Sequence, residues 1–452
     1  MELKGKRVLV VGLGKSGLAA ALFLRRQGAQ VTVSDVRSAE SLAKEIPTLL
    51  EEGIMVEAGG HGLLTFRRQD LIVVSPGVPL DTPALVQVRS FGVPVIGELE
   101  LAARFLKGRI LAITGSNGKT TTTALTGEIL KEAGFRTLVA GNIGVPVVGL
   151  IEQSTDDTWP VLEVSSFQLE TTERFHPHIA VILNITPDHL DRHGTFESYA
   201  LAKERIFAEQ NKNDSLVLNA DNERTAEAAS RSAARVFWFS LEHPVGQGAW
   251  LEDGSVVYRT APGAPVETVL PLSAIPLKGA HNAENVLAAV CAARLAGAPV
   301  EAIRRAVEAF KAVEHRLEHV ATINGVEFYN DSKATNVDAT AKAVAAFSSG
   351  IHLILGGKDK GSNYTQLAPL LRQRVRAVYT IGSAAAKIES QLRGVVSILS
   401  CQTLERAVNA AAGAAGAGEV VLLAPACSSF DQFENYEHRG RVFKQLVAQR
   451  KG

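Results

Sequence analysis

The sequence has no excess of charge of either sign, because its 452 residues include 47 Lys and Arg and 47 Asp and Glu. That balance gives no basic surface of the kind that nucleic-acid-binding proteins use. No run approaches the roughly 18–20 apolar residues that a membrane span requires. A hydrophobic content of 46% with 21% charged residues is typical of a globular protein, and at about 150 residues per domain the length predicts three domains.

Cysteine is also scarce, since Cys291, Cys401 and Cys427 are far apart and odd in number. Their spacing excludes a disulfide framework and a zinc-binding pattern. The first seven residues lead directly into a predicted strand, so we expect no secretory signal. These features together predict a cytoplasmic protein without a membrane span or a nucleic-acid partner.

Predicted strands and helices alternate along the chain, which is typical of α/β domains with mostly parallel sheets. Three series of strands are expected, at residues 7–11, 31–34, 71–74 and 93–96, then at 109–113, 137–140, 160–164, 179–184 and 215–218, and then at 325–329, 352–355, 377–381, 396–399 and 419–423. Residues 240–275 contain Gly, Pro and short Val-rich pieces, which predict irregular β structure. Helices are predicted at 283–296 and 300–310.

Residues 111–123 carry the strongest chemical signal, because an apolar strand runs into a Gly-rich turn, a lysine and a row of threonines. The two glycines of the turn permit backbone N–H groups to face phosphate oxygens. Lys119 can reach the terminal phosphates of a nucleotide, and the hydroxyl of Thr120 or Thr121 can bind Mg²⁺. A full P-loop has one more glycine, so this is a shortened form. It predicts an ATP site.

A second glycine motif, Gly-Leu-Gly-Lys-Ser-Gly at residues 12–17, follows a strand and precedes a predicted helix, with Asp35 at the end of the next strand. This is the local pattern of a dinucleotide-binding βαβ unit. The strand of the ATP loop begins near residue 109, which leaves room for half of such a fold and for one nucleoside diphosphate. The loop at 74–79 also follows a strand end, where such sheets bind ligands. A purely structural turn is the alternative for each loop, and the loop at 74–79 would look the same in either case.

Polar side chains follow two strands of the same region as the ATP loop. Glu163 can supply an oxygen ligand to Mg²⁺, and His189 can supply a nitrogen ligand or a hydrogen bond to a transferring group. The structural alternatives are a strand-end carboxylate for Glu163 and a neighbour of a helix cap for His189.

Lys203 lies in a predicted helix, four residues from Tyr199 and four from Phe207, so it shares a partly apolar face with two aromatic rings. Burial there would lower the pKa of Lys203 and favour the neutral amine. A neutral amine can react with CO₂ to give a carbamate, which is an oxygen ligand for a second Mg²⁺. A surface lysine whose stem covers apolar groups is the alternative.

With the ATP loop, several further segments give the sequence its resemblance to the Mur ligases, the ATP-dependent amide-forming enzymes of peptidoglycan precursor synthesis. These segments are residues 162–170, 184–194, 278–289, 314–318, 330–336 and 425–440. The resemblance covers the whole chain and its domain order. Within the family it points to the members that add D-glutamate to UDP-N-acetylmuramoyl-L-alanine. The DNPR-type motif of members that add meso-diaminopimelate or lysine is absent from the sequence, and alanine-adding members usually have a different tail.

The resemblance implies three domains: a Rossmann-like UDP-binding domain at 1–97, a P-loop domain with a mostly parallel sheet at 98–312, and a Rossmann-like domain for the incoming amino acid at 313–452. It also implies an acyl-phosphate intermediate, release of ADP and phosphate, two Mg²⁺ ions and a carbamylated Lys203. The expected partners are the two small-molecule substrates, and the expected state is a monomer.

The resemblance assigns roles residue by residue. Lys119, Glu163, His189 and Lys203 are expected at the reaction centre, the last three as metal ligands together with Thr120. The residues expected to bind ATP are Gly115, Ser116, Asn117, Gly118, Lys119, Thr120, Thr121, Asn282, Arg316 and Asp331. Those expected to bind the UDP substrate are Lys15, Ser16, Asp35, Arg37, Ser75, Gly77, Asn142, Ser165 and Gln168, and those expected to bind D-glutamate are Lys360, Ser429 and Tyr436.

Two positions depart from the family pattern. Many relatives have Phe where this chain has Tyr436, and Thr where it has Val36, which removes a hydroxyl contact to UDP. Other classes also remain open. A P-loop switch or transport ATPase explains only the ATP loop, and a nicotinamide oxidoreductase explains only residues 12–17. Folate-type glutamate ligases share the ATP loop and the architecture.

Overall fold

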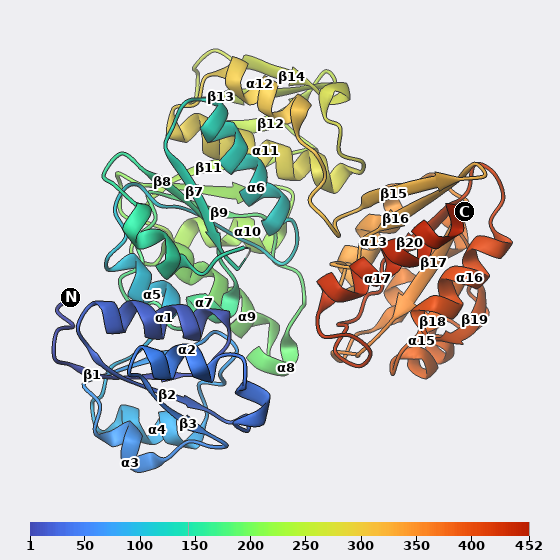
Figure 1. Cartoon of the computed structure of the whole chain (residues 1–452). Helices are drawn as coiled ribbons and strands as arrows, with labels where there is room; N and C mark the ends of the chain where they lie inside the picture. Colours follow the sequence, from blue (N-terminus) through green and yellow to red (C-terminus); the bar gives the residue numbers. More distant parts are fainter. Residues whose placement is uncertain (143, 452) are drawn as a thin grey trace. The chain divides into compact units, whose positions relative to one another are not determined.

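The computed structural model describes residues 1–142 and 144–451, which form alternating strands and helices (Figure 1). They divide into two compact units. The first contains residues 1–185, 197–270 and 287–306, and the second contains 186–196, 271–286 and 307–452. In the described part of the chain, no helix has both the length and the apolar character that crossing a membrane takes.

The N-terminal sheet is parallel, with strand order β3-β2-β1-β4-β5. Its strands and helices are β1 (Arg7–Val11), α1 (Lys15–Arg26), β2 (Gln30–Asp35), α2 (Ile46–Glu51), β3 (Met55–Ala58), α3 (Leu63–Arg67), β4 (Leu71–Val74), α4 (Pro83–Ser90) and β5 (Val95–Gly97). Helices α1 and α2 cover one face and α3 and α4 the other (Figure 1). Leu9 and Val11 of β1 pack with Phe66 and Leu85 on the side of α3 and α4, as the period of two in a strand requires. The strand order reverses between β1 and β4, so the loops after these strands lie where such sheets bind ligands.

The second sheet of the first unit has strand order β14-β13-β12-β11-β10-β9-β6-β8-β7. Its strands are β6 (Leu111–Thr114), β7 (Thr137–Gly141), β8 (Trp159–Glu163), β9 (Ile179–Ile182), β10 (Ser215–Asn219), β11 (Arg235–Ser240), β12 (Gly248–Glu252), β13 (Ser255–Arg259) and β14 (Glu267–Pro271). The helices between the first and third sheets are α5 (Glu98–Ala103), α6 (Lys119–Glu132), α7 (Ser166–Leu169), α8 (Leu190–His193), α9 (Phe196–Glu204), α10 (Glu223–Ala228), α11 (Ala280–Ala296) and α12 (Val300–Ala309).

The stretch 240–275 is regular, contrary to the prediction of irregular β structure. Strands β12 and β13 pair antiparallel in unbroken register. Asp253 and Gly254 join them with φ values of +47° and +72°, the conformation of a tight hairpin turn that an Asp-Gly pair favours.

The third sheet lies in the second unit, with strand order β15-β16-β20-β17-β18-β19. Its strands and helices are β15 (Glu318–Ile323), β16 (Val326–Asn330), α13 (Val337–Ala345), β17 (Ile351–Gly356), α14 (Ala368–Arg374), β18 (Val375–Ile381), α15 (Ala385–Gln391), β19 (Ser397–Gln402), α16 (Leu404–Ala414), β20 (Val420–Leu423) and α17 (Tyr436–Ala448). Only the edge pair β15–β16 is antiparallel among the pairings described. Leu353 and Leu355 of β17 face one hydrophobic core and Ile354 faces the other, as expected for a strand covered on both sides.

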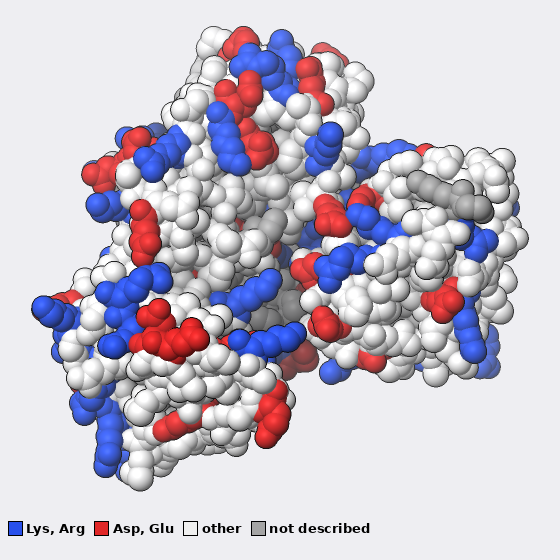
Figure 2. Space-filling model, in the orientation of Figure 1, with Lys and Arg blue, Asp and Glu red and all other residues white. Residues whose placement is uncertain are grey.

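The surface reflects the balanced composition. On the face drawn in Figure 2, basic and acidic side chains are interspersed over both units.

Candidate functional site

A cavity of about 660 Å³ lies at the carboxyl ends of β1, β2 and β4. The turn between β1 and α1 is tight, because a Cβ atom on Gly17 would lie 1.9 Å from the carbonyl oxygen of Gly12. Only glycine fits that approach. Among the lining residues are all those predicted in this domain to bind UDP, namely Lys15, Ser16, Asp35, Arg37, Ser75 and Gly77. The structure therefore brings these residues together, and their contact with UDP remains a prediction.

Asp35 organises one wall of this cavity. Its Oδ2 accepts a 2.6 Å hydrogen bond from the backbone N–H of Leu13, and its Oδ1 accepts one from the N–H of Arg37 at 2.8 Å. The Arg37 guanidinium also contacts Oδ2 at 3.0 Å. Burial opposes ionisation of Asp35, but these hydrogen bonds outweigh it and lower the pKa of the carboxyl. Both oxygens receive protein donors, so the geometry gives Asp35 the task of positioning Arg37.

His61 also lines the cavity, and sequence reasoning missed it. It stands two residues before α3, in a Gly-Gly-His-Gly segment after β3. A histidine between glycines after a parallel strand was the available signal, because strand-end loops carry ligand-binding side chains.

The ATP loop joins β6 to α6 in the predicted strand–turn–helix arrangement. Gly118 caps the helix with φ +85°, a left-handed conformation that favours glycine. The Nζ atom of Lys119 donates to the carbonyl oxygens of Gly115 at 2.7 Å and Ser116 at 2.9 Å. Asn184, which sequence reasoning gave no role, holds the loop by accepting from the N–H of Asn117 at 2.8 Å.

Lys203 is buried beside this loop. Its Nζ atom donates to the carbonyl oxygen of Gly115 at 2.7 Å and lies 4.6 Å from the centre of the Tyr199 ring. The Tyr199 hydroxyl lies 3.0 Å from Oγ of Ser116. With 1% of its surface exposed, Lys203 is not the surface lysine of the alternative reading. The predicted pairing with an aromatic face is confirmed for Tyr199.

Glu163 ends β8, the neighbour of β6. Its Oε1 accepts a 2.8 Å hydrogen bond from Nδ2 of Asn142. Its Oε2 is buried and has no hydrogen-bond partner among the described residues. An unpartnered buried carboxylate oxygen is costly unless a cation or donor meets it. The residues present thus fit a magnesium ion, for which carboxylate oxygen is a preferred ligand.

Ser165 and Gln168, predicted to bind substrate, make a local structural contact. The N–H of Ser165 donates to Oε1 of Gln168 at 2.9 Å, and the N–H of Gln168 donates to Oγ of Ser165 at 3.3 Å. This capping box starts α7. Their contact with substrate remains a prediction.

The second unit contains Asn282, Arg316 and Asp331, which are predicted to contact the nucleotide. Arg316 stands between His315 and Leu317, whose φ values are +66° and +42°. Oδ1 of Asp331 accepts from the N–H of Leu317 at 3.3 Å. Burial raises the pKa of Asp331 to about 6, against the opposing effects of Arg316 and the Leu317 N–H. Asn282, near the start of α11, is also buried and donates to the carbonyl oxygen of Lys278 at 2.7 Å.

A cavity of about 200 Å³ in the second unit is lined by Lys360 and His189. Lys360 Nζ lies 3.4 Å from Oδ1 of Asp188, and Oδ2 of Asp188 accepts from Asn336 at 2.9 Å. His189 was predicted to lie with the ATP loop, but residues 186–196 belong to the second unit. Its role as a metal ligand therefore remains a prediction.

Arg439 is a buried residue that sequence reasoning passed over. Its guanidinium donates to the carbonyl oxygens of Ser332 at 2.8 Å and Cys427 at 3.1 Å. Burial lowers the pKa of Arg439 to about 10. It ties the loop after β16 to the loop after β20, which contains Ser429. The Ser332 hydroxyl donates to the carbonyl oxygen of Tyr436 at 2.9 Å, which joins the first helical residue of α17 to the same network.

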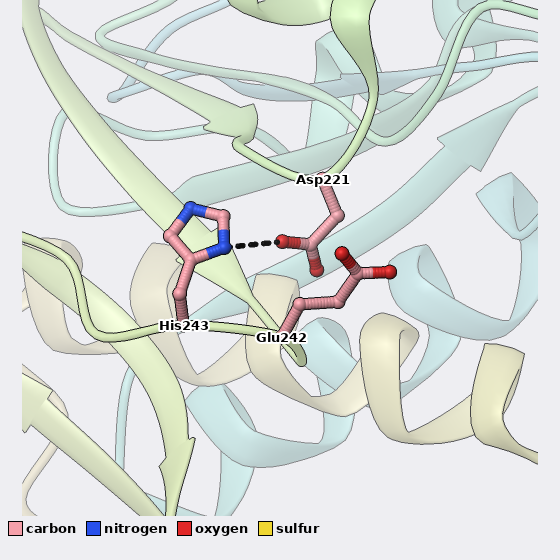
Figure 3. Close-up of side chains that lie close together, drawn as sticks. All are labelled: Asp221, Glu242 and His243. Atoms are coloured by element: carbon pink, nitrogen blue, oxygen red, sulfur yellow. Dashed lines mark ion pairs between the residues drawn. The ribbon is translucent and has the colours of Figure 1, made fainter.

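Among the described residues, two other groups of potential metal ligands contain side chains that already pair with protein groups. Figure 3 shows Asp221, Glu242 and His243, with His243 Nδ1 at 3.4 Å from Oδ1 of Asp221. Oδ2 of Asp221 also accepts from the N–H of Leu241 at 2.6 Å, which fixes the loop after β11. The second group contains Glu314, His315 and Glu318, and both of its carboxylates pair with Lys444.

Comparison with known proteins agrees with this arrangement. Three family models match consecutive stretches: the Mur ligase MurD-like N-terminal domain at 6–97, the Mur ligase middle domain at 113–293 and the Mur ligase glutamate ligase domain at 315–427. The UDP-N-acetylmuramoylalanine--D-glutamate ligase of Acidobacterium capsulatum is 70% identical over 452 residues, covering 100% of this chain and 98% of that protein. The chain belongs to the Mur ligase family. A ligase of the same name from Koribacter versatilis is 61% identical over 447 residues, covering 99% of this chain and 98% of that one.

Solved Mur ligases share the fold. The UDP-N-acetylmuramate-alanine ligase of Thermotoga maritima has a TM-score of 0.61 at 19% identity, covering 98% of this chain and 99% of that one. The MurF ligase of Thermotoga maritima, solved in complex with ADP, has a TM-score of 0.61 at 17% identity, covering 99% of this chain and 96% of that one. The predicted three-domain α/β architecture of the Mur ligases is therefore confirmed.

Proposed function

We propose that this chain is an ATP-dependent ligase that joins D-glutamate to UDP-N-acetylmuramoyl-L-alanine in peptidoglycan precursor synthesis. The observation that carries the proposal is the grouping of Lys119 and Lys203 on one carbonyl oxygen of the ATP loop. Two cations on a phosphate-binding turn are suited to a transferring phosphoryl group. The acceptor is proposed from the names of relatives that are 70% and 61% identical.

The reaction needs ATP because a free carboxylate is a poor electrophile. Transfer of the γ-phosphoryl group to the alanyl carboxylate gives an acyl phosphate and ADP. The amine of D-glutamate then attacks the carbonyl carbon, forms the amide and releases phosphate. We propose that Lys119 exchanges its two loop carbonyls for phosphate oxygens when ATP binds.

Mg²⁺ is proposed at Glu163 and Thr120, and when bound it would neutralise charge on the phosphoryl group. Asn142 holds Glu163 by one carboxylate oxygen and leaves Oε2 for the ion. We propose that Lys203 loses one proton to become the neutral amine and then adds CO₂ at Nζ with loss of a second proton, which turns a buried cation into an anionic oxygen ligand. His189 is a further proposed ligand.

The substrates are proposed to bind in separate places. UDP occupies the cavity of the N-terminal domain, and Lys360, Ser429 and Tyr436 receive D-glutamate. Asn282, Arg316 and Asp331 are proposed to contact the nucleotide. The proposed domain limits are 1–97, 98–312 and 313–452, and the proposed state is a monomer.

The test is product analysis by mass spectrometry after incubation with Mg²⁺, ATP and UDP-N-acetylmuramoyl-L-alanine. We expect a product heavier by one glutamate residue with D-glutamate and none with L-glutamate, with one ADP formed per product. A product with L-glutamate, or with diaminopimelate in place of D-glutamate, would overturn the assignment of the acceptor.

A further inference from the structure

The cavity of the N-terminal domain has two chemically different sides. Gly14, Lys15 and Ser16 lie at the start of α1, where N–H donors and a lysine suit a diphosphate. Val36 and Arg37 follow β2, and His61 follows the neighbouring strand β3. A nucleoside diphosphate whose phosphates meet α1 therefore extends its nucleoside over β2 toward His61.

The contacts of Ser34 determine which nitrogen of His61 carries the proton. Oγ of Ser34 lies 2.7 Å from Nδ1 of His61 and donates to the carbonyl oxygen of Gly60 at 3.1 Å. A hydroxyl has one hydrogen, so both contacts are hydrogen bonds only if Nδ1 is the donor to Ser34. The proton of the neutral ring is then on Nδ1, and Nε2 has a lone pair that can accept.

The surroundings of His61 favour the neutral ring and fix its position. Burial lowers the pKa of His61 and outweighs the carboxylates of Asp35 and Glu57, which act in the opposite direction. The ring packs edge-on against Phe66, with centroids 5.5 Å apart. Nδ1 is turned toward buried Ser34, and His61 is one of the residues that line the cavity. Nε2 has no hydrogen-bond partner in residues 1–142 and 144–451.

We propose that His61 is a specificity-determining residue that accepts, through Nε2, a hydrogen bond from the uridine of the substrate. This inference rests on the proposed binding of UDP in the same cavity. Uridine offers the imide N3–H of uracil and the ribose hydroxyls as donors.

The test is isothermal titration of the full chain with UDP, without ATP or metal. His61→Asn keeps a donor near the position of Nδ1 but lacks the distant acceptor, and we expect about tenfold weaker binding from the loss of one hydrogen bond. His61→Gln places an amide oxygen near the position of Nε2 and should recover most of that affinity. His178→Asn, on an exposed histidine of the same unit, is the matched control and should bind as the parent does.

Two ligand analogues identify the donor. N3-methyl-UDP tests the imide, and 2′,3′-dideoxy-UDP tests the hydroxyls. The analogue that lacks the donor should bind the parent about tenfold more weakly, and it should lose nothing further in His61→Asn. Equal affinity of UDP for the parent and His61→Asn overturns the inference and leaves the proposed function intact. No binding of UDP to the parent overturns both.

Discussion

The two glycine loops of the first unit place a lysine at the same point of a helix and give it different surroundings. Lys15 and Lys119 each open their helix directly after a glycine cap. Lys15 is exposed beside a cavity. Lys119 bonds to two loop carbonyls, and buried Lys203 bonds to one of the same oxygens. We therefore propose that one local motif serves binding in the first loop and phosphoryl transfer in the second, and that the neighbouring residues decide which.

The largest effect on turnover is expected from removing Lys119, the lysine of the ATP loop. Lys119→Ala should lower kcat by about a thousandfold or more, because the group that meets the transferring phosphoryl is lost, and should leave UDP affinity unchanged. The matched variant Lys15→Ala should weaken UDP binding and leave kcat near the parent value. Steady-state kinetics with UDP titrations compare the two. Equal losses of kcat in both variants would contradict the division of labour.

Lys203→Ala should lower kcat by about a hundredfold, since a proposed oxygen ligand to Mg²⁺ disappears. The parent enzyme should also lose activity in CO₂-free buffer and regain it on addition of bicarbonate, while the variant should not respond. Lys212→Ala, at an exposed lysine of the same unit, is the control. Near-normal turnover of Lys203→Ala would show that no carbamate is needed.

Gly17→Ala tests the close approach in the first loop. The added methyl would lie 1.9 Å from the carbonyl oxygen of Gly12 and 2.8 Å from Oγ of Ser75, so we expect a loss of about 3 kcal/mol in the free energy of unfolding. UDP affinity should fall with it. Gly149→Ala, at an exposed glycine outside the cavity where a Cβ atom meets nothing within 4 Å, is the control. Thermal unfolding and parallel UDP titrations compare the two variants. Equal Tm values would contradict the expected destabilisation by Gly17→Ala.

A buried carboxyl, Glu98, lies in the sequence between the two glycine loops. Oε1 of Glu98, at the start of α5, accepts from the N–H of Val148 at 2.8 Å, and Oε2 has no hydrogen-bond partner among the described residues. Burial raises the pKa of Glu98 from 4.5 to about 7, although the N–H groups of Val147 and Val148 act against it. The native state therefore holds this proton more tightly than the unfolded state does. Stability is lost as the pH rises from 4.5 to 7 and stays reduced above 7.

Glu98→Gln keeps an acceptor for Val148 and cannot ionise. It should be more stable than the parent at pH 8, by on the order of 2–3 kcal/mol, and should show no gain near pH 4. Glu100→Gln is the control, because Glu100 accepts from Arg104 and from the Glu173 N–H and should lose stability at both pH values. The test is Tm measured as a function of pH for the parent and both variants. A Tm difference between Glu98→Gln and the parent that is the same at all pH values would contradict the titration of Glu98.

The smallest effect is expected at Val36, which lines the first cavity and is 66% exposed. Val36→Thr restores the hydroxyl that many Mur ligases have there. We expect about a twofold gain in UDP affinity, the size of a solvent-exposed hydrogen bond. Titration calorimetry is sufficient, and a loss of affinity would show that the apolar side chain is the better fit.

Local sequence patterns predicted the strand–turn–helix loops well, because their chemistry depends on residues close together in the chain. The edge strands β3 and β15 and the interior strand β11 were missed, since the pairing of a strand depends on its neighbours more than on its own pattern. The Asp253–Gly254 hairpin was the overlooked turn signal within the stretch predicted to be irregular.

In the candidate site, too, residues set by local sequence were predicted and residues set by tertiary contacts were not. The cavity residues of the first domain were predicted because they follow strand ends, where α/β sheets bind ligands. Arg439 could not be predicted, because in sequence it resembles a solvated helix charge and its partners lie on two separate loops earlier in the chain. His61 depends in the same way on a tertiary contact to Ser34.

Phosphate release tests the central claim most directly. The parent enzyme is given Mg²⁺ and ATP, with UDP-N-acetylmuramoyl-L-alanine and D-glutamate added separately and together. The account predicts sustained phosphate release only when both substrates are present. UDP-N-acetylmuramoyl-L-alanine must be bound at the first loop before the ATP loop can transfer a phosphoryl group to it, and D-glutamate must then displace the phosphate. Sustained release with neither substrate would contradict the account and would mark the chain as a plain ATPase.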